Sequence, residues 1–390
     1  MYRLVTIITI QQQPSDKYPD RKAVLNFDFV HEFTSSDSWK DLTNKGSLTI
    51  PKNLYYKDGN GKMQPLNGTN ICIGGFSEAP LFLRGDKVQI ESGYKYYNEQ
   101  HREIIDTAIM FTGYVTKVHS KIPIQLDLED NMWKLKQVQV PTMTFTTSDT
   151  LEDIMKLLIK GTGFTTTALT VTNFGEFQIG GETAAQVLKR LQKTYGFEFY
   201  FRGDDLRGGI LIYIESEAVR QEFRFQKNII SDELEYWRKD DIVLSVYAHN
   251  TLTEDTGHLC KDGSKKTKKK RLAVLVTIKN GSRIDTPIAE GDQPPENIEG
   301  ERTTFFDTGA KTVQVLADNA YSHLIKYYYD GFKGTFTTFG IPFVRQGDNA
   351  SIKDPVLPER DGLYKIKAVD YAGGVNGLRQ TIHIDYRINV

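Results

Sequence analysis

The sequence predicts a mainly β protein with an α+β insertion, and three observations support this. Aromatic residues make up 11% of the 390 residues, and aromatic side chains favour half-buried pleated strands. Apolar and polar residues alternate along many segments, from 4–10 near the start to 380–388 near the end, as they do in strands with one buried face. Helical spacing is confined to three segments, two of which fall between 141 and 225.

Composition limits the class of protein. Hydrophobic residues are 39% and charged residues 25%, which is typical of globular chains, and the length favours two or three domains. Lys and Arg number 49 against 50 Asp and Glu, so the overall charge gives no sign of a dedicated nucleic-acid or membrane binder. The two cysteines, Cys72 and Cys260, provide no disulfide framework and favour synthesis in a reducing compartment.

Neither a signal peptide nor a membrane span is predicted. The apolar run at 4–10 is short and β-branched, and no small-residue cleavage site follows it. No apolar stretch approaches the roughly 20 residues that a spanning helix needs. We therefore expect synthesis in the bacterial cytoplasm and, if the protein leaves the cell, departure by another route.

Residues 1–140 are predicted to form a first β-barrel. Alternating strands are expected at 4–10, 24–34 and 46–51, followed by a loop rich in D-G and N-G turn pairs. Further strands are expected at 85–90, 109–118 and 123–130, joined by Gly or Pro turns.

Residues 141–225 are predicted to form a small α+β domain. Asp149 and Glu152 resemble a capping box, Leu151, Ile154, Met155 and Leu158 then share one helical face, and Gly161 ends that helix. A second helix is expected after Thr183, ending at Gly196. A hairpin is then predicted between 197–201 and 210–216, turning across 202–209.

Residues 226–390 are predicted to form a second β-barrel with one helix near 311–330. Strands are expected at 242–250, 271–278 and 302–308, and again from 334 to the end. The buried stripe of the helix is predicted to be Val313, Leu316, Ala317, Ala320, Leu324 and Tyr328.

A short theme occurs once in each predicted barrel. Gly85-Asp86 and Gly347-Asp348 each follow an Arg-containing apolar segment, and each leads to an alternating strand, a strand carrying Gly and Tyr, and a closing strand. Glycine adopts positive φ in such a turn, and aspartate accepts hydrogen bonds from nearby backbone N–H groups. The theme predicts an internal duplication: two related barrels flanking the α+β domain.

Three segments in one order resemble the baseplate hub proteins of contractile tails. Residues 111–137 are similar to the closing strands of the family's first barrel, 174–201 to its small α+β domain, and 317–352 to its helix followed by a Gly-x-Thr strand, a Gly-x-Pro turn and a Gly-Asp turn. The family includes the tail hub of Mu-like phages, the late control protein D group and the N-terminal region of the valine-glycine-repeat spike of type VI secretion.

The resemblance implies a virion structural protein that acts in a phage, a prophage or a related contractile injection system. In such a protein two tube-type barrels per chain form a homotrimeric ring with pseudo-sixfold symmetry. The implied partners are the hexameric tail tube, a separate spike protein and other baseplate proteins, with DNA passing through the lumen without sequence-specific binding. The implied location is the tail baseplate of the virion, and the family provides no catalytic residues to transfer.

One basic segment is a candidate for partner contact. Lys265, Lys266, Lys268, Lys269, Lys270 and Arg271 form the strongest charge run. No aromatic residues alternate with them for base stacking, so the alternatives are a solvated hairpin tip and contact with an acidic neighbouring subunit.

The remaining motifs have ordinary structural explanations. His258 and Cys260 lack further ligands nearby for a metal site, and Arg84-Gly85-Asp86, which matches an adhesion tripeptide, falls where a turn is predicted. Three glycosylation sequons are regarded as chance matches. The acidic pairs at 128–131 and 203–205 are assigned to turns and helix starts. We therefore predict no catalytic, cofactor-binding or metal site.

Three other functions remain open from the sequence. A tail-tip or distal tail protein of a non-contractile phage would share the barrels. A tail-associated cell-wall-degrading enzyme would need two facing carboxylates, which sequence alone does not locate. A carbohydrate-binding adhesin would bind glycans saturably.

Overall fold

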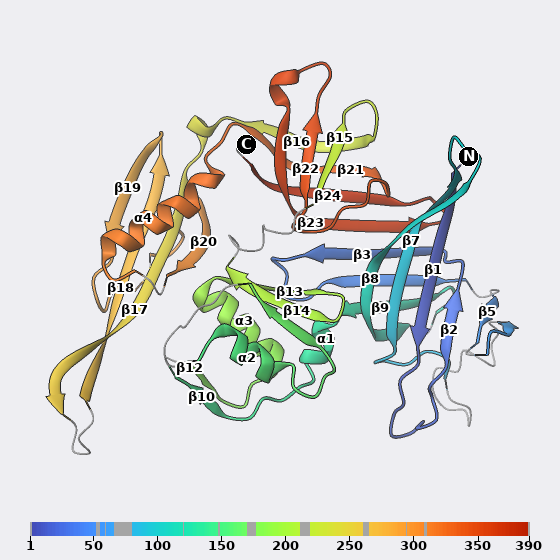
Figure 1. Ribbon diagram of the computed structural model, residues 1–390, viewed down its shortest axis with the longest axis horizontal. Coiled ribbons are helices and arrows are strands. Elements are labelled where there is room, and N and C mark those ends of the chain that lie inside the picture. The colour runs from blue at the N-terminus through green and yellow to red at the C-terminus, as the bar shows by residue number, and fades with distance from the viewer. Residues whose placement is uncertain are drawn as a thin grey trace.

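The computed structural model describes most of the chain. The described residues form mainly β-strands (Figure 1). The described residues are 2–51, 55–58, 60–65, 80–119, 121–146, 149–169, 177–210, 219–259, 265–293, 295–307 and 310–388. The prediction of a mainly β protein is confirmed.

The N-terminal part of the chain forms antiparallel strands whose side chains alternate between core and solvent. In β9 (Ile124–Asp130), for example, every second side chain is buried. The other strands of this part are β1 (Arg3–Gln11), β2 (Val24–Phe27), β3 (Glu32–Ser38), β4 (Lys45–Ile50), β5 (Tyr55–Lys57), β6 (Met63–Pro65), β7 (Lys87–Tyr97) and β8 (Glu103–His119).

A small unit of helices and short strands follows these strands (Figure 1). It has its own buried core. Its elements are α1 (Met132–Leu135), β10 (Met143–Phe145), α2 (Leu151–Leu158), β11 (Thr165–Ala168), β12 (Phe177–Ile179), α3 (Ala184–Tyr195), β13 (Phe197–Arg202) and β14 (Asp205–Ile210). Strands β10 and β12 pair with each other, and β11, β14 and β13 form a second sheet. Met132 and Leu135 belong to this core, so the core takes in residues that precede 141.

The two longer helices of this unit begin at capping boxes. Thr183 caps α3 together with Gln186, and Gly196 ends that helix in the left-handed region at φ 68°, as predicted. For α2 the predicted box is wrong by one residue, because Thr150 is the N-cap and Asp153 provides the reciprocal carboxylate. A threonine hydroxyl can cap as an aspartate can, and here the residue nearer the helix does so.

The predicted hairpin after α3 is present but turns earlier than expected. Strand β14 begins at Asp205 and pairs with β13 from Arg202 onward, so the turn is Gly203-Asp204. Gly203 has φ 64°, a conformation that glycine adopts without steric cost. The predicted second strand was 210–216; Ile210 ends β14, and residues 211–216 lie outside the described residues.

The C-terminal part returns to the sheet that the N-terminal strands began. Its strands are β15 (Arg220–Arg224), β16 (Ile229–Trp237), β21 (Gly331–Phe339), β22 (Asn349–Lys353), β23 (Gly362–Gly374) and β24 (Arg379–Arg387). Together with the N-terminal strands they form one ladder in the order β16-β21-β24-β23-β3-β4-β9-β8-β7-β1-β2-β5-β6, and β22 links β15 to β23. Within the described ranges this ladder stays open.

The strands between 226 and 390 fall into two sheets rather than one. Residues between β16 and β21 form a separate four-stranded sheet in the order β19-β18-β17-β20, against which α4 packs (Figure 1). Its elements are β17 (Leu244–Leu259), β18 (Lys265–Lys279), β19 (Ser282–Pro287), β20 (Glu301–Phe306) and α4 (Val313–Leu324). Short 3-10 turns at Lys239–Asp241, Ile325–Tyr327 and Pro358–Arg360 complete the fold.

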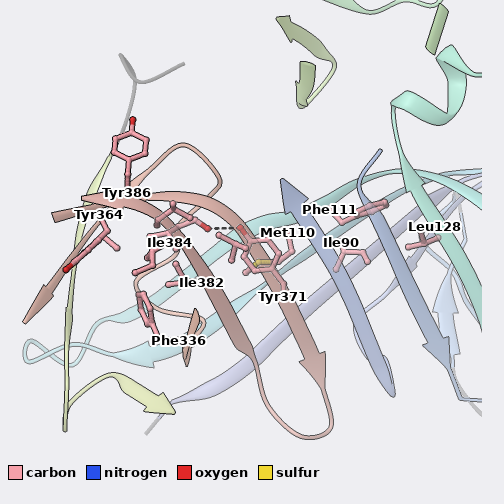
Figure 2. Close-up of a cluster of buried hydrophobic side chains, with 14 of the residues drawn as sticks. Ile90, Met110, Phe111, Leu128, Phe336, Tyr364, Tyr371, Ile382, Ile384 and Tyr386 are labelled. Atoms are coloured by element: carbon pink, nitrogen blue, oxygen red, sulfur yellow. Dashed lines mark hydrogen bonds between the residues drawn. The ribbon is translucent and has the colours of Figure 1, made fainter. Parts of the chain in front are cut away.

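The largest hydrophobic core is continuous from the N-terminal strands to the C-terminal strands. Figure 2 shows Ile90, Phe111 and Leu128 in the same cluster as Phe336 and Ile384. Each of these side chains is 5% exposed or less. Among the helices of the described ranges, none is long and apolar enough to cross a membrane.

Candidate assembly interface

The same five-strand arrangement occurs twice in the chain. The N-terminal strands follow the order β3-β4-β9-β8-β7, and the C-terminal strands follow the order β16-β21-β24-β23-β22, with every neighbouring pair antiparallel. The chain visits the strands of each set in the same sequence. We name these sets module A (β3, β4, β7, β8, β9) and module B (β16, β21, β22, β23, β24).

The two Gly-Asp turns occupy the same place in each module and make the same hydrogen bonds. The Gly85 N–H donates to the Val115 carbonyl at 2.8 Å, and the Val115 N–H donates to the Asp86 carbonyl at 2.9 Å. The Gly347 N–H donates to Ile366 at 2.8 Å, and Ile366 donates to Asp348 at 2.9 Å. Both glycines have positive φ, 96° and 87°. The repeat identified in the sequence is therefore a structural repeat.

A β-bulge extends the equivalence beyond the turn. In module A, Val115 pairs with Leu128 and Lys117 with Asp127, so Thr116 is the extra residue. In module B, Ile366 pairs with Ile384 and Ala368 with His383, so Lys367 is the extra residue. Bulges bend a strand and fix its register, and the shared bulge aligns Val115 with Ile366.

Glycine also recurs at one ladder position of β4 and β21. Gly46 pairs with Leu128, and Gly334 pairs with Ile384. A Cβ on Gly46 would lie 2.9 Å from the Thr34 carbonyl oxygen, and one on Gly334 would lie 2.2 Å from the Glu233 carbonyl oxygen. The close approach of the neighbouring strand therefore requires glycine in both modules.

Each module has a histidine–aspartate pair between two neighbouring strands, β8 and β9 in module A and β23 and β24 in module B. The strand that carries the histidine differs between the two modules. His119 Nε2 of β8 lies 2.8 Å from Asp127 Oδ2 of β9. His383 Nε2 of β24 lies 2.7 Å from Asp370 Oδ2 of β23. In the bulge alignment, His119 of module A is equivalent to Asp370 of module B, and Asp127 is equivalent to His383. Both modules therefore have the same interaction, but the histidine and the aspartate have exchanged strands.

The carboxylates of the two turns have different surroundings. Arg21 forms a bidentate ion pair with Asp86, with Nη1–Oδ1 at 2.8 Å and Nη2–Oδ2 at 2.6 Å, and both side chains are buried. Arg21 also donates to the carbonyls of Gln13, Pro80 and Leu81, so all five of its N–H groups are used.

Asp348 holds its turn mainly with backbone donors. Its carboxylate accepts from the Arg345 N–H at 2.9 Å, as Asp86 does from Leu83 at 2.8 Å. It also accepts from the Val219 N–H at 3.2 Å, where Asp86 accepts from Gln13. The turn occurs in both modules, whereas the buried Arg21, which lies between β1 and β2, pairs with the turn of module A.

Module A and module B are joined edge to edge. Strand β3 pairs with β23 from Glu32↔Gly374 to Ser38↔Ala368. Next to this joint, within module A, the Ser35 hydroxyl of β3 donates to the Met110 carbonyl of β8 at 3.4 Å. Beside it the Asp37 side chain is half-buried, and this partial burial raises the pKa of its carboxyl, while Arg202 and Arg345 partly offset that rise.

The equivalent edge of module B is open. Strand β16 has β21 as its one strand neighbour in the described part of the chain. Most of its residues are exposed, including Glu233 and Glu235, and Trp237 is 40% exposed. Exposed edge strands present unpaired N–H and C=O groups that pair readily with another strand, which makes β16 a candidate assembly edge.

The predicted basic loop is a strand. The six residues all lie in β18, where five of them pair with β17: Lys265, Lys268, Lys269, Lys270 and Arg271, but not Lys266. Lys268, Lys269, Lys270 and Arg271 are exposed, and Arg271 donates to the Tyr247 hydroxyl. These residues therefore lie in a strand rather than in a loop, because the pairing of β17 with β18 extends through the charged run. Residues 260–264 lie outside the described part.

The strongest enzyme-like feature is a small hollow of about 120 Å³ lined by two acids, Asp37 and Asp130. Burial raises the pKa of Asp130 to about 7. Its oxygens accept from the backbone N–H groups of Asn44 at 3.1 Å and Met132 at 3.0 Å. Such contacts hold the start of α1 against β4, which is a structural task.

The other motifs give little further chemistry. The described residues contain no group of three or more His, Cys, Asp or Glu placed to hold a metal ion. Cys72 and Cys260 lie outside the described residues, as does the side chain of His258. Arg84 lies over the Trp133 ring at 5.8 Å, and Asp86 of the Arg-Gly-Asp tripeptide is fully buried.

Comparison with solved structures identifies the fold. A 43 kDa tail protein of prophage MuSo2 from Shewanella oneidensis is 13% identical, with a TM-score of 0.52 over 98% of both chains. A tail protein from Neisseria meningitidis MC58 is 13% identical, with a TM-score of 0.56 over 98% of this chain and 97% of the other. The chain has the phage tail-protein fold.

The tail-protein fold agrees with the family resemblance of the sequence, which is confirmed at the level of architecture. No protein-family model matches the sequence, and no curated protein matches it. With 13% identity to either structure, the likeness is one of fold.

Sequence reasoning found the Gly-Asp turns but missed Arg21, the open edge of β16 and the separate sheet of β17–β20. Arg21 lies 65 residues from Asp86, and no local pattern links them. The edge could have been suspected from the three acids of Ile229–Trp237, since charged residues protect edge strands.

Proposed function

We propose that this chain is a structural, non-enzymatic hub of a tail baseplate, and that three copies form a ring of six similar modules. One observation carries the proposal: a single chain holds the same five-strand module twice, with β3 of one module against β23 of the other. A head-to-tail contact between non-identical surfaces generates rings when the rotation closes. Three such chains would offer six near-equivalent surfaces to a sixfold tube.

The proposed partners follow from this ring. A hexameric tail tube would sit on one face, a separate trimeric spike protein on the other, and further baseplate proteins around the rim. DNA would pass through the lumen without sequence-specific contacts. We propose the ranges 1–140 and 226–390 as the tube-type units and 141–225 as the small domain between them, all located in the tail of a virion or of a prophage-derived injection machine.

The exposed lysines of β18 would serve this assembly. Lys268 pairs in register with Glu254 of β17, and Lys269 pairs with Thr253. The strand places several positive charges on one projecting hairpin (Figure 1). An acidic neighbouring subunit is the partner that suits such a surface.

Co-assembly with the tail tube protein of the same virus tests the function. The purified chain is mixed with that tube protein and examined by negative-stain electron microscopy. We expect tubes that carry one cap, at one end, with a visible central pore. Tubes that start and end without the chain, at all mixing ratios, would contradict the hub function.

A peptidoglycan zymogram tests the enzymatic alternative. We expect no lysis from the purified chain. Clear lysis that is lost in Asp130→Asn would replace the hub with a cell-wall-degrading enzyme, and unchanged lysis in that variant would place the activity elsewhere in the chain.

A further inference from the structure

The internal joint between the modules predicts the joint between copies. Strand β3 of module A covers β23 beside the end of β22, and the bulge alignment shows which strand of module A is equivalent to β23. That strand is β8. Its pairing with β7 stops at Tyr114, which lies opposite Lys87, the first residue of β7. After Tyr114, no described strand pairs with this side of β8. Each chain therefore contains one formed joint, between β3 and β23, and, in its described part, two unpaired edges that could form a second joint, β16 and the end of β8.

The two open surfaces can be aligned residue by residue. Ser35 pairs with Gly46, and Leu234 pairs with Gly334, so the common glycine makes Ser35 equivalent to Leu234. Counting along the strand, Ser38 is equivalent to Trp237, and Ser36 to Glu235.

The partner strand follows from the bulge. With Val115 equivalent to Ile366, Lys117 corresponds to Ala368 and His119 to Asp370. In the joint that is made, Ala368 pairs with Ser38 and Asp370 pairs with Ser36.

Transferring that register to the open surfaces gives a specific pairing. We propose that β16 of one copy pairs antiparallel with the end of β8 of the next copy, with Trp237 opposite Lys117, Tyr236 opposite Val118 and Glu235 opposite His119. This inference rests on the ring proposed above and specifies its contact between subunits.

Charge supports this occupant over another β16 strand. Strand β16 carries Asp232, Glu233 and Glu235, and like charges directly opposite each other destabilise a sheet. The end of β8 and the turn after it carry Lys117, His119 and Lys121, with Asp127 of β9 beside His119. Positive charge on one edge and negative charge on the other favour a head-to-tail contact and disfavour a twofold one.

The faces of the strands also agree. Val118 packs partly against the main core, as does Leu234, and Tyr236 stacks edge-on against Phe332 with ring centroids 5.8 Å apart. In the proposed register Val118 and Tyr236 lie on the same, inward face. Lys117 and His119 then share the outer face with Trp237 and Glu235, because side chains alternate along a strand.

Reversing the charges of one edge tests the pairing. We compare the full chain with the variant Glu233→Lys/Glu235→Lys and measure the mass in solution by sedimentation velocity. We expect a trimer for the unaltered chain and at least tenfold weaker association for the variant. The control Glu290→Lys/Glu296→Lys makes the same change of charge on an exposed loop and should leave the trimer intact.

A compensating variant keeps the test independent of folding. Adding Lys117→Glu and Lys121→Glu to the reversed chain restores opposite charges across the joint, and we expect the trimer to return. If the reversed chain remains as trimeric as the control, the pairing is overturned while the proposed ring stands. If the unaltered chain forms twofold dimers, the proposed hub function is overturned as well.

Discussion

Modules A and B have the same strand arrangement but differ in the contacts that stabilise it. Both have the turn, the bulge, the close-approach glycine and the crossed His–Asp pair. Module A adds the buried Arg21–Asp86 pair and connects β3 to β4 by a short loop, whereas module B places an entire four-stranded sheet with α4 between β16 and β21. The two modules therefore share backbone features, whereas the side chains that stabilise those features differ between them.

The largest difference between the modules should appear when Arg21 is replaced. In Arg21→Met the Asp86 carboxylate stays buried without its ion partner, and we expect a loss of about 3–5 kcal/mol in the free energy of unfolding. The matched variant Asp348→Ala removes two backbone contacts and should cost about 1–2 kcal/mol. Urea unfolding followed by fluorescence measures both, and equal losses would show that the turns are held alike.

The chain should lose stability as pH rises, through one acid at the end of β9 and one in the small unit. Burial raises the pKa of Asp130 and of Glu198 to about 7 each, from ordinary values of 3.8 and 4.5. The folded chain therefore keeps these protons at pH values where the unfolded chain releases them. Their contribution is complete below about pH 4 and is lost as pH rises through 7.

Neutral variants of these two acids should flatten that dependence. Between pH 4.5 and 7.5 we expect the unaltered chain to lose on the order of 6 kcal/mol more than Asp130→Asn/Glu198→Gln, roughly half from each carboxyl. Urea unfolding at the two pH values measures the difference. Parallel pH profiles for the two chains would show that these carboxyls ionise normally in the folded state.

The two turn glycines should respond alike. Gly85→Ala and Gly347→Ala each force a side chain into positive φ, and we expect each to cost about 1–2 kcal/mol. Gly180 has open space around its Cα and ordinary φ, so Gly180→Ala is the matched control with no comparable loss. A large cost in one module alone would argue against equivalent turns.

The smallest effect is expected from converting one crossed pair into the other. His119→Asp combined with Asp127→His gives module A the arrangement of module B. Partly exposed ion pairs contribute less than about 1 kcal/mol. The free energy of unfolding of the double variant should therefore lie within about 1 kcal/mol of that of the unaltered chain. Each single variant, which lacks the pair, should be less stable than the double variant. A double variant that is less stable than both singles would show that the two sites are not equivalent.

The sequence was sufficient for the features that local chemistry determines. Alternation predicted the strands, Thr183 and Gly196 bounded α3, and the Gly-Asp theme located both turns. Each of these depends on residues a few positions apart, where backbone conformation and side-chain type are directly linked.

Features that depend on distant contacts could not be predicted in the same way. The Arg21–Asp86 pair, the joint between β3 and β23 and the allocation of strands to two sheets all join residues far apart in the chain. The predicted register of the α2 capping box and the position of the turn at Gly203 were wrong by small shifts, because several neighbouring residues could play the same part.

A reconstruction of the assembled ring by electron cryo-microscopy would test most directly whether one joint is used within and between chains. We predict threefold symmetry with six similar lobes, in which β16 of each copy lies against β8 of the next in the register that Ser38 and Ala368 show inside the chain. Copies related by a twofold axis, or a ring whose contacts leave β16 uncovered, would contradict it.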